Sequence, residues 1–160
     1  MHEQRFSKRL FLLCCFLLIP AGAWGDHPVK VRPAPQTPAQ EQARQLAAMG
    51  TKYLYQDDYR QAAKAFQAAT QLDPQDAEAY FSWGFALGAL GQRQEEIKKY
   101  ELAVRCDPAF GEAYVAWALA LVQLGRQEEA KAKVSEALAV APEAITPMQL
   151  MVLKALDLLE

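Results

Sequence analysis

Apolar and small residues recur along the chain at helical spacing, and their pattern repeats every 34 residues. The match is strictest between two segments, in which Tyr80, Trp83, Leu87 and Gly91 are followed 34 residues later by Tyr114, Trp117, Leu121 and Gly125. Prolines mark the same period, at Pro74, Pro108 and Pro142. Apolar spacing of three and four residues, interrupted by glycine and then by proline, predicts two helices in each unit. A fixed period of this length predicts a stacked helical repeat array.

Residue size alternates in a way that suits closely packed helix pairs. Small residues recur at Ala69, Ala103 and Ala137, where two helices can approach, and the large apolar residues fill the remaining space. Charged residues recur with the same period on the other side of the second helix in the second and third units. We expect ion pairs four residues apart on a solvated helix face, between Glu95 and Lys99 and between Glu129 and Lys133.

These positions resemble the tetratricopeptide repeat, with units at 43–76, 77–110 and 111–144. The eighth position holds Gly50, Gly84 and Ala118, and the twenty-fourth holds Phe66, Tyr100 and Val134. The resemblance implies an all-α solenoid, a right-handed superhelix of three helix-turn-helix units. The chain departs from the family pattern at Glu96, where a small residue is usual, and at Asp57, which replaces the turn glycine of the first unit.

The resemblance also implies a function, because this family binds partners in a concave groove lined by the first helix of each unit. The groove residues expected to contact a partner are Tyr55, Phe81, Phe85, Val115, Leu119, Val122 and Gln123. This largely apolar set favours a peptide or an amphipathic helix as the ligand. The lysines and asparagines with which some relatives clamp a C-terminal carboxylate are absent. We therefore expect a protein-interaction adaptor of another kind, whose groove could instead be filled by the chain itself.

The first 42 residues are expected to lie outside the array. Residues 1–25 combine a basic start, an apolar run of about ten residues and small residues near Ala23, which is typical of a secretory signal peptide. Residues 26–42 hold four prolines and predict a semi-extended tether. We expect an exported protein of the bacterial periplasm that serves envelope assembly or secretion. The alternative is an uncleaved inner-membrane anchor, although the apolar run is short for a membrane span.

Residues 145–160 predict a capping helix that covers the last unit. Thr146, Pro147 and Gln149 form the pattern of a capping box with proline at the first helical position. The helix, expected to reach about Leu159, is more apolar than one packed face requires, and its surplus could form a homodimer contact. The residues expected to do so are Met148, Met151, Leu158 and Leu159. A self-associating or membrane-anchored scaffold is therefore the alternative to an adaptor.

The sequence contains little that suggests catalysis. Both histidines, His2 and His27, precede the array, and neither a phosphate-binding loop nor metal-ligand spacing occurs, so we expect neither enzyme activity nor a cofactor or metal. The net charge of −2 becomes −4 once residues 1–25 are removed, which disfavours nucleic acid as a partner. Cys106 occupies a position held by Leu72 and Val140 in the other units, so we expect buried filler rather than a reactive thiol or an intermolecular disulfide.

Overall fold

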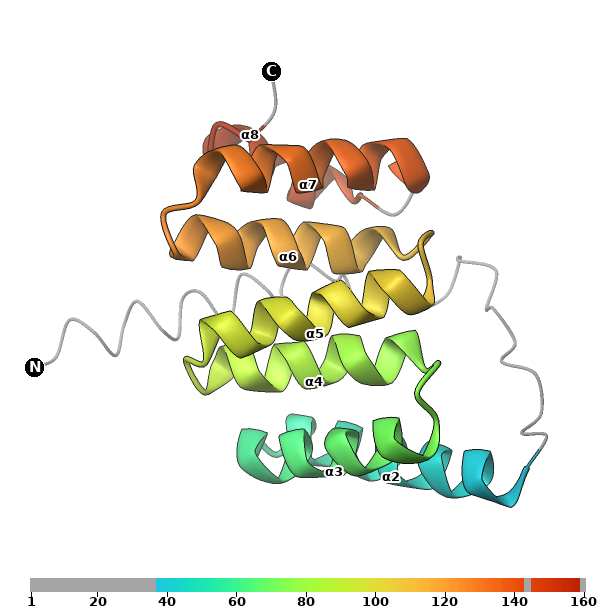
Figure 1. Ribbon diagram of the computed structural model, residues 1–160. Helices are drawn as coiled ribbons and strands as arrows, with labels where there is room; N and C mark the ends of the chain where they lie inside the picture. Colours follow the sequence, from blue (N-terminus) through green and yellow to red (C-terminus); the bar gives the residue numbers. More distant parts are fainter. Residues whose placement is uncertain (1–36, 143–144, 159–160) are drawn as a thin grey trace, which may run out of the picture.

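A computed structural model describes residues 37–142 and 145–158, and every regular element in these ranges is a helix (Figure 1). The helices are α2 (Pro38–Tyr55), α3 (Tyr59–Leu72), α4 (Ala77–Ala89), α5 (Arg93–Cys106), α6 (Gly111–Gln123), α7 (Gln127–Val140) and α8 (Pro147–Ala155). α2 packs on α3, α4 on α5 and α6 on α7, while the pairs are joined through α3 with α4 and α5 with α6. The predicted all-α solenoid of three helix pairs is confirmed.

The closeness of each pair is set by two facing positions whose sizes compensate. A Cβ atom on Gly50 would lie 2.9 Å from the Phe66 ring, and one on Gly84 would lie 2.7 Å from the Tyr100 ring. In the third unit Ala118 and Val134 occupy these positions, and both are fully buried. An aromatic side chain on the second helix is thus matched by glycine on the first, and a smaller valine by alanine, because interiors pack to nearly constant density.

The turn inside each unit uses one hydrogen-bond pattern three times. In the second unit the N–H of Gln92 donates to the carbonyl of Leu87 (2.9 Å), and Gly91 has a φ of 79°. Gly125 repeats this with a φ of 73°, and Asp57 adopts the same left-handed conformation with a φ of 56°. This is the Schellman ending of a helix, in which glycine is preferred because it lacks a Cβ. Asp57 therefore bears a backbone strain that the two glycines avoid.

The two ends of the array differ from the sequence-based boundaries. α2 begins at Pro38, so the tether prediction is wrong for residues 38–42; the Thr37 side chain accepts a hydrogen bond from the N–H of Gln40 (3.2 Å) and starts the helix early. At the other end the predicted capping box at Thr146 is present, but α8 ends at Ala155 rather than near Leu159. It ends there because Asp157 turns into the left-handed region, with a φ of 55°.

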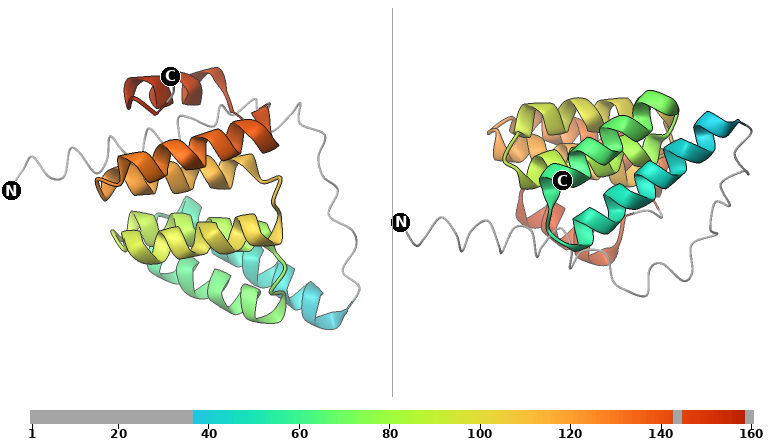
Figure 2. Two further views of the ribbon diagram at one scale, coloured as in Figure 1. Left: turned by 45° about the horizontal axis from the view of Figure 1, so that its top comes forward. Right: turned by 90° about the horizontal axis from the view of Figure 1, so that it is seen from below.

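α8 covers the last helix pair as predicted. Leu153 and Leu158 are 1% and 3% exposed and belong to the same apolar core as Leu121 and Val134. The amide of Gln127 on α7 also donates to the backbone carbonyl of Leu156. Seen from below in Figure 2, α8 and α2 lie on the same side of the array, opposite α5. The side formed by the first helices α2, α4 and α6 thus begins with α2 at one end of the array and is followed by α8 at the other end.

The predicted signal peptide and most of the predicted tether lie outside the described residues. Within the described part of the chain, none of the helices has the length and apolar character needed to span a membrane.

Candidate functional site

The first helices of the three units, α2, α4 and α6, place the residues predicted to line the groove at different depths. Tyr55 at the end of α2 is 70% exposed, and Gln123 at the end of α6 is also exposed. Four of the set are half-buried, namely Phe81, Phe85, Leu119 and Val122. Val115 is only 2% exposed and belongs to the core, so the prediction that it contacts a partner is wrong. The accessible surface therefore lies nearer the helix ends than the family positions imply.

Phe81 is less available to a partner than its repeat position suggests. Its ring centre lies 5.7 Å from that of Tyr100 on α5 and 5.1 Å from that of Phe110, which precedes α6. Both rings are tilted relative to Phe81, the arrangement that aromatic pairs prefer. Phe81 therefore packs within the second unit, against α5 and against the residue that leads into α6, and removing it would loosen the array as well as alter the groove.

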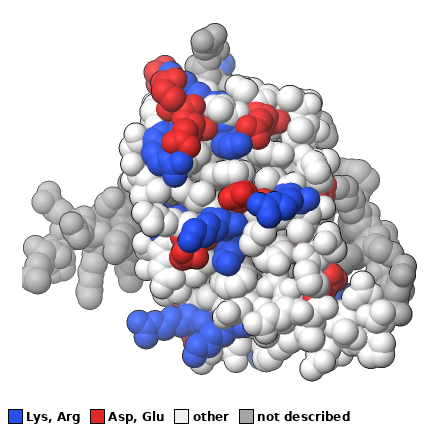
Figure 3. Space-filling view, in the orientation of Figure 1, with Lys and Arg blue, Asp and Glu red and all other residues white. Residues whose placement is uncertain are grey.

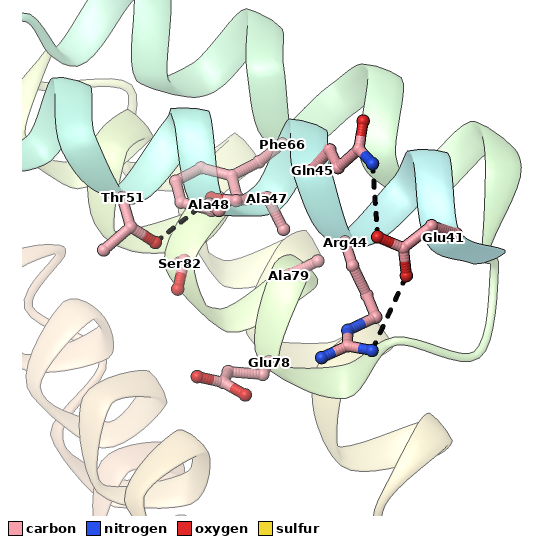
Figure 4. A pocket seen from close by; sticks show the side chains of 10 residues that line it. All are labelled: Glu41, Arg44, Gln45, Ala47, Ala48, Thr51, Phe66, Glu78, Ala79 and Ser82. Atoms are coloured by element: carbon pink, nitrogen blue, oxygen red, sulfur yellow. Dashed lines mark hydrogen bonds and ion pairs between the residues drawn. The ribbon is translucent and has the colours of Figure 1, made fainter. Parts of the chain in front are cut away.

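The most clearly hollowed part of this side lies between α2 and α4 (Figure 4). The hollow has a volume of about 420 Å³, within the range of roughly 300–1,000 Å³ that ligand pockets occupy. Small side chains make its walls, and Phe66, which is 1% exposed, lies beneath them. The lining residues are Glu41, Arg44, Gln45, Ala47, Ala48, Thr51, Phe66, Glu78, Ala79 and Ser82. None of the seven residues singled out from the sequence is among them.

Charged groups stand at one end of this hollow. Arg44 extends from α2 toward Glu41, and the two side chains form an ion pair at 3.6 Å (Figure 4). Glu41 also accepts a hydrogen bond from the Gln45 amide at 3.2 Å, while Glu78 lies on α4 across the hollow. The side chains of Glu41 and Arg44 are 49% and 45% exposed, so their mutual attraction is weakened by solvent and costs little to exchange for another partner.

A buried carboxylate lies between α4 and α5, at the position where the family usually has a small residue. Glu96 is 6% exposed; its Oε2 accepts a hydrogen bond from Arg93 (2.7 Å), and its Oε1 accepts one from the Tyr100 hydroxyl (3.2 Å). Burial raises the pKa of Glu96, although both hydrogen bonds and the Arg93 charge oppose this. Gly88 makes the space, because a Cβ there would lie 2.5 Å from the carboxylate.

The opposite side of the array carries two repeated contacts that the sequence did not predict. Lys99 Nζ lies 3.9 Å from the centre of the Trp83 ring, and Lys133 Nζ lies 4.4 Å from that of Trp117. The predicted attraction of these lysines to Glu95 and Glu129 is present as a Coulombic interaction, but among the described residues no hydrogen bond joins either pair. Those carboxylates instead accept hydrogen bonds from Lys98 and from Arg126. A helical lysine can reach an aromatic residue on the neighbouring helix, and a search confined to one helix misses that partner.

Figure 3 shows this opposite side, where basic and acidic side chains lie together in rows over α7 and α5, while those over α3 are basic. The lowered pKa of Glu95 follows from its hydrogen bond to Lys98, and the lowered pKa of Glu129 from its bond to Arg126. Both carboxylates are exposed, which makes them ordinary members of a solvated helix face rather than catalytic acids.

Cys106 is half-buried rather than fully buried, which corrects the prediction of a core filler. Its thiol donates a hydrogen bond to the carbonyl of Pro74 (3.4 Å), and burial raises its pKa. A raised pKa leaves less thiolate and hence a slower nucleophile. In the part of the chain that the structure describes, no three histidine, cysteine or carboxylate side chains gather as metal ligands would.

The residues of the C-terminal segment that were predicted for self-association differ in exposure. Leu158 is buried in the core and is not available to a second copy, so that prediction is wrong, whereas Met151 is 68% exposed. Met148 and Leu159 have side chains outside the described set. Leu150, which was not predicted, is 37% exposed on α8 near Met151.

Comparison with known proteins agrees with this geometry. Residues 50–91 match the family model described as "TPR repeat". The crystal structure of MamA is similar with a TM-score of 0.63 and 25% identity over 66% of this chain, which spans 61% of that chain. The Arabidopsis OM64 TPR domain is similar with a TM-score of 0.69 and 21% identity, covering 74% of this chain and 97% of that one.

A third solved structure is the first TPR of Spaghetti (RPAP3), bound to the HSP90 peptide SRMEEVD, with a TM-score of 0.68 and 22% identity over 74% of this chain and 92% of that one. The comparison with curated proteins found no match. The repeat period, the compensating pairs between helices and the shared turn geometry agree with the family match and the structural neighbours. Residues 50–91 thus match the model of the tetratricopeptide repeat, and the chain has the fold of the tetratricopeptide-repeat structures to which it is similar.

Proposed function

We propose that this chain is a non-enzymatic adaptor that holds a segment of a partner protein on the side formed by α2, α4 and α6. The observation that carries the proposal is the hollow between α2 and α4, which lies on the side where the family binds its partners. Support also comes from the first TPR of Spaghetti and from the TPR2B domain of yeast Sti1, both of which are solved with chaperone peptides or complexes. Domains of this fold generally serve as interaction modules.

We also propose that the adaptor acts outside the cytoplasm, in the bacterial envelope. The support is the sequence of residues 1–25, with its basic start, apolar run and small residues. Fractionation of cells expressing the full chain, with mass analysis of its N-terminus, tests this part. A mature start near Trp24 or Asp26 supports export, whereas an intact N-terminus in the membrane fraction supports the anchored alternative.

The groove itself is tested by filling the hollow without disturbing the core. Ala48 and Thr51 are both exposed on α2 and line the hollow, so Ala48→Arg/Thr51→Arg places two large side chains in it. Gln67→Arg/Gln71→Arg is the matched control, because these residues are exposed on α3 outside the hollow and gain the same charge. Partners captured by the native chain should be lost with the first variant and kept with the second. Retention by both would refute the groove.

A self-associating scaffold remains the second candidate, because Leu150 and Met151 expose apolar surface on α8. Sedimentation of the native chain and of Met151→Glu separates the two. A dimer that this substitution dissociates supports the scaffold, and a monomer at all concentrations supports the adaptor.

A further inference from the structure

The helices that form the binding side differ sharply from their partners in charge. α4 and α6 contain no lysine or arginine, and their only charged side chains are Glu78 and Glu112. Basic residues instead gather on the second helices, where α5 alone contains Arg93, Lys98, Lys99 and Arg105. α2 contributes Glu41, Arg44 and Lys52. Most of the cations of the helix pairs thus lie on the second helices, among carboxylates on the side shown in Figure 3, whereas the first helices carry only Arg44 and Lys52.

From this distribution we infer the chemistry of the segment that the groove takes, an inference that rests on the proposed function. We propose that the hollow between α2 and α4 accepts a large aliphatic side chain from an amphipathic helix, while a lysine or arginine of that helix meets Glu41 and Glu78. The hollow supplies the apolar part through Ala47, Ala48 and Ala79, which leave room for a bulky group above Phe66.

The charges at the mouth of the hollow complement a cation. Among the described residues that line the hollow, the charged side chains are the carboxylates of Glu41 and Glu78 and the guanidinium of Arg44, which together sum to a net negative charge. Because Arg44 holds Glu41 only at 3.6 Å and both are about half exposed, an incoming cation can share this carboxylate at little cost. The next unit continues the trend, since Glu112 follows Glu78 at the same repeat position.

The same charges disfavour an acidic segment. The peptide bound to the first TPR of Spaghetti ends in Glu-Glu-Val-Asp, and its carboxylates would meet the carboxylates of Glu41 and Glu78 here. Like charges brought together on binding reduce affinity and so exclude wrong partners. The fold is shared with that domain, but the charge selectivity is expected to be reversed.

The test uses the full-length chain and two labelled synthetic peptides. One peptide places leucine and lysine on opposite faces of a helix, and its twin replaces every lysine by glutamate. Binding is followed by fluorescence anisotropy at low and at physiological salt. We expect the lysine peptide to bind at least about ten times more tightly than its twin, with the difference shrinking as salt rises.

Two charge variants assign the effect to the hollow. Glu41→Lys/Glu78→Lys should weaken binding of the lysine peptide by about tenfold and improve binding of its twin. Glu128→Lys/Glu136→Lys makes the same change in net charge on α7, away from the hollow, and should leave both affinities within about twofold of the native values. Thermal unfolding of each variant verifies that the array is intact.

Each outcome decides one of the two proposals. Equal binding of both peptides, or equal losses in the two charge variants, overturns the charge inference. If, in that case, Ala48→Arg/Thr51→Arg abolishes the binding of the peptides, the proposed groove function survives. If neither peptide binds the native chain, the charge inference is overturned. If peptides bind but filling the hollow has no effect, the groove function fails as well.

Discussion

The pair formed by Gly88 and Glu96 provides the sharpest test of how this array is packed. Gly88 lies on α4 directly opposite the buried carboxylate of α5, and a Cβ at Gly88 would come within 2.5–2.8 Å of the carboxylate atoms. These distances are too short for any carbon–oxygen contact, so Gly88→Ala must displace the Glu96 side chain. The side chain cannot move freely, because Arg93 and Tyr100 hold its two oxygens at 2.7 and 3.2 Å.

The size of the effect follows from two opposing terms. Alanine is favoured over glycine within a helix by about 1 kcal/mol. Displacing a buried carboxylate from its hydrogen bonds costs about 1.5–3 kcal/mol for each bond to a charged group. If one of the two bonds is lost, we therefore expect Gly88→Ala to lower the free energy of unfolding by about 0.5–2 kcal/mol, although an alanine in an ordinary helix would raise it.

A double-mutant cycle separates this clash from other effects. Glu96→Ala restores the small residue found at Ala62 and Ala130 in the other units, both of which are fully buried. In that background Gly88→Ala should become neutral or stabilising, because the alanine then occupies space that the carboxylate has left. Urea unfolding of the four proteins, followed by circular dichroism, gives the coupling energy, expected at about 2 kcal/mol in favour of the double variant. Additive effects would refute the idea that Gly88 and Glu96 compensate for each other.

Three further outcomes are expected. Gly91→Ala should cost about 1–2 kcal/mol of unfolding free energy, since its φ of 79° is strained for alanine and no neighbour lies within 4 Å of the new Cβ; a cost below about 0.5 kcal/mol in urea unfolding would contradict this. Burial raises the pKa of Glu96 above its value in the unfolded chain, so the native protein loses stability as the pH rises from the unfolded-state pKa toward the folded-state pKa. Glu96→Gln has no carboxyl group to titrate at this position, so its free energy of unfolding relative to the native protein should increase from pH 4 to pH 7. A difference that does not change with pH would refute the pKa shift. Lys99→Met should cost about 0.5–1 kcal/mol in the same assay by removing the contact with Trp83, and Lys98→Met, on the exposed face, should cost less.

The fold could be predicted from the sequence because its determinants are periodic and local. The 34-residue spacing, the small residue opposite each large one and the turn glycines each predict the same array, and all three agree with the structure. The first and last residues of the helices at the two ends of the array could not be predicted in this way. Thr37 and Asp157 start and end helices through single side-chain and backbone bonds that periodicity does not report.

The candidate site was harder to predict because exposure depends on contacts between units. Val115 and Phe81 have groove positions by repeat number, yet the first is buried and the second packs against Phe110 at the end of its own unit. The hollow between α2 and α4 depends on the smallness of Ala47, Ala48 and Ala79, a feature that a search for large apolar residues passes over. The small size of these three alanines was the signal in the sequence that could have located the hollow.

The proposed binding side is tested most directly by asking which residues touch a bound partner. A photo-crosslinking amino acid is placed at Thr51, which faces the hollow, and separately at Gln67, which is exposed on α3. Both chains are produced in cells that make the natural partner, irradiated and analysed by mass spectrometry. The account predicts a crosslinked partner segment from Thr51, with lysine or arginine near its aliphatic residues, and none from Gln67. Crosslinks from Gln67 alone, or equally from both positions, would contradict it.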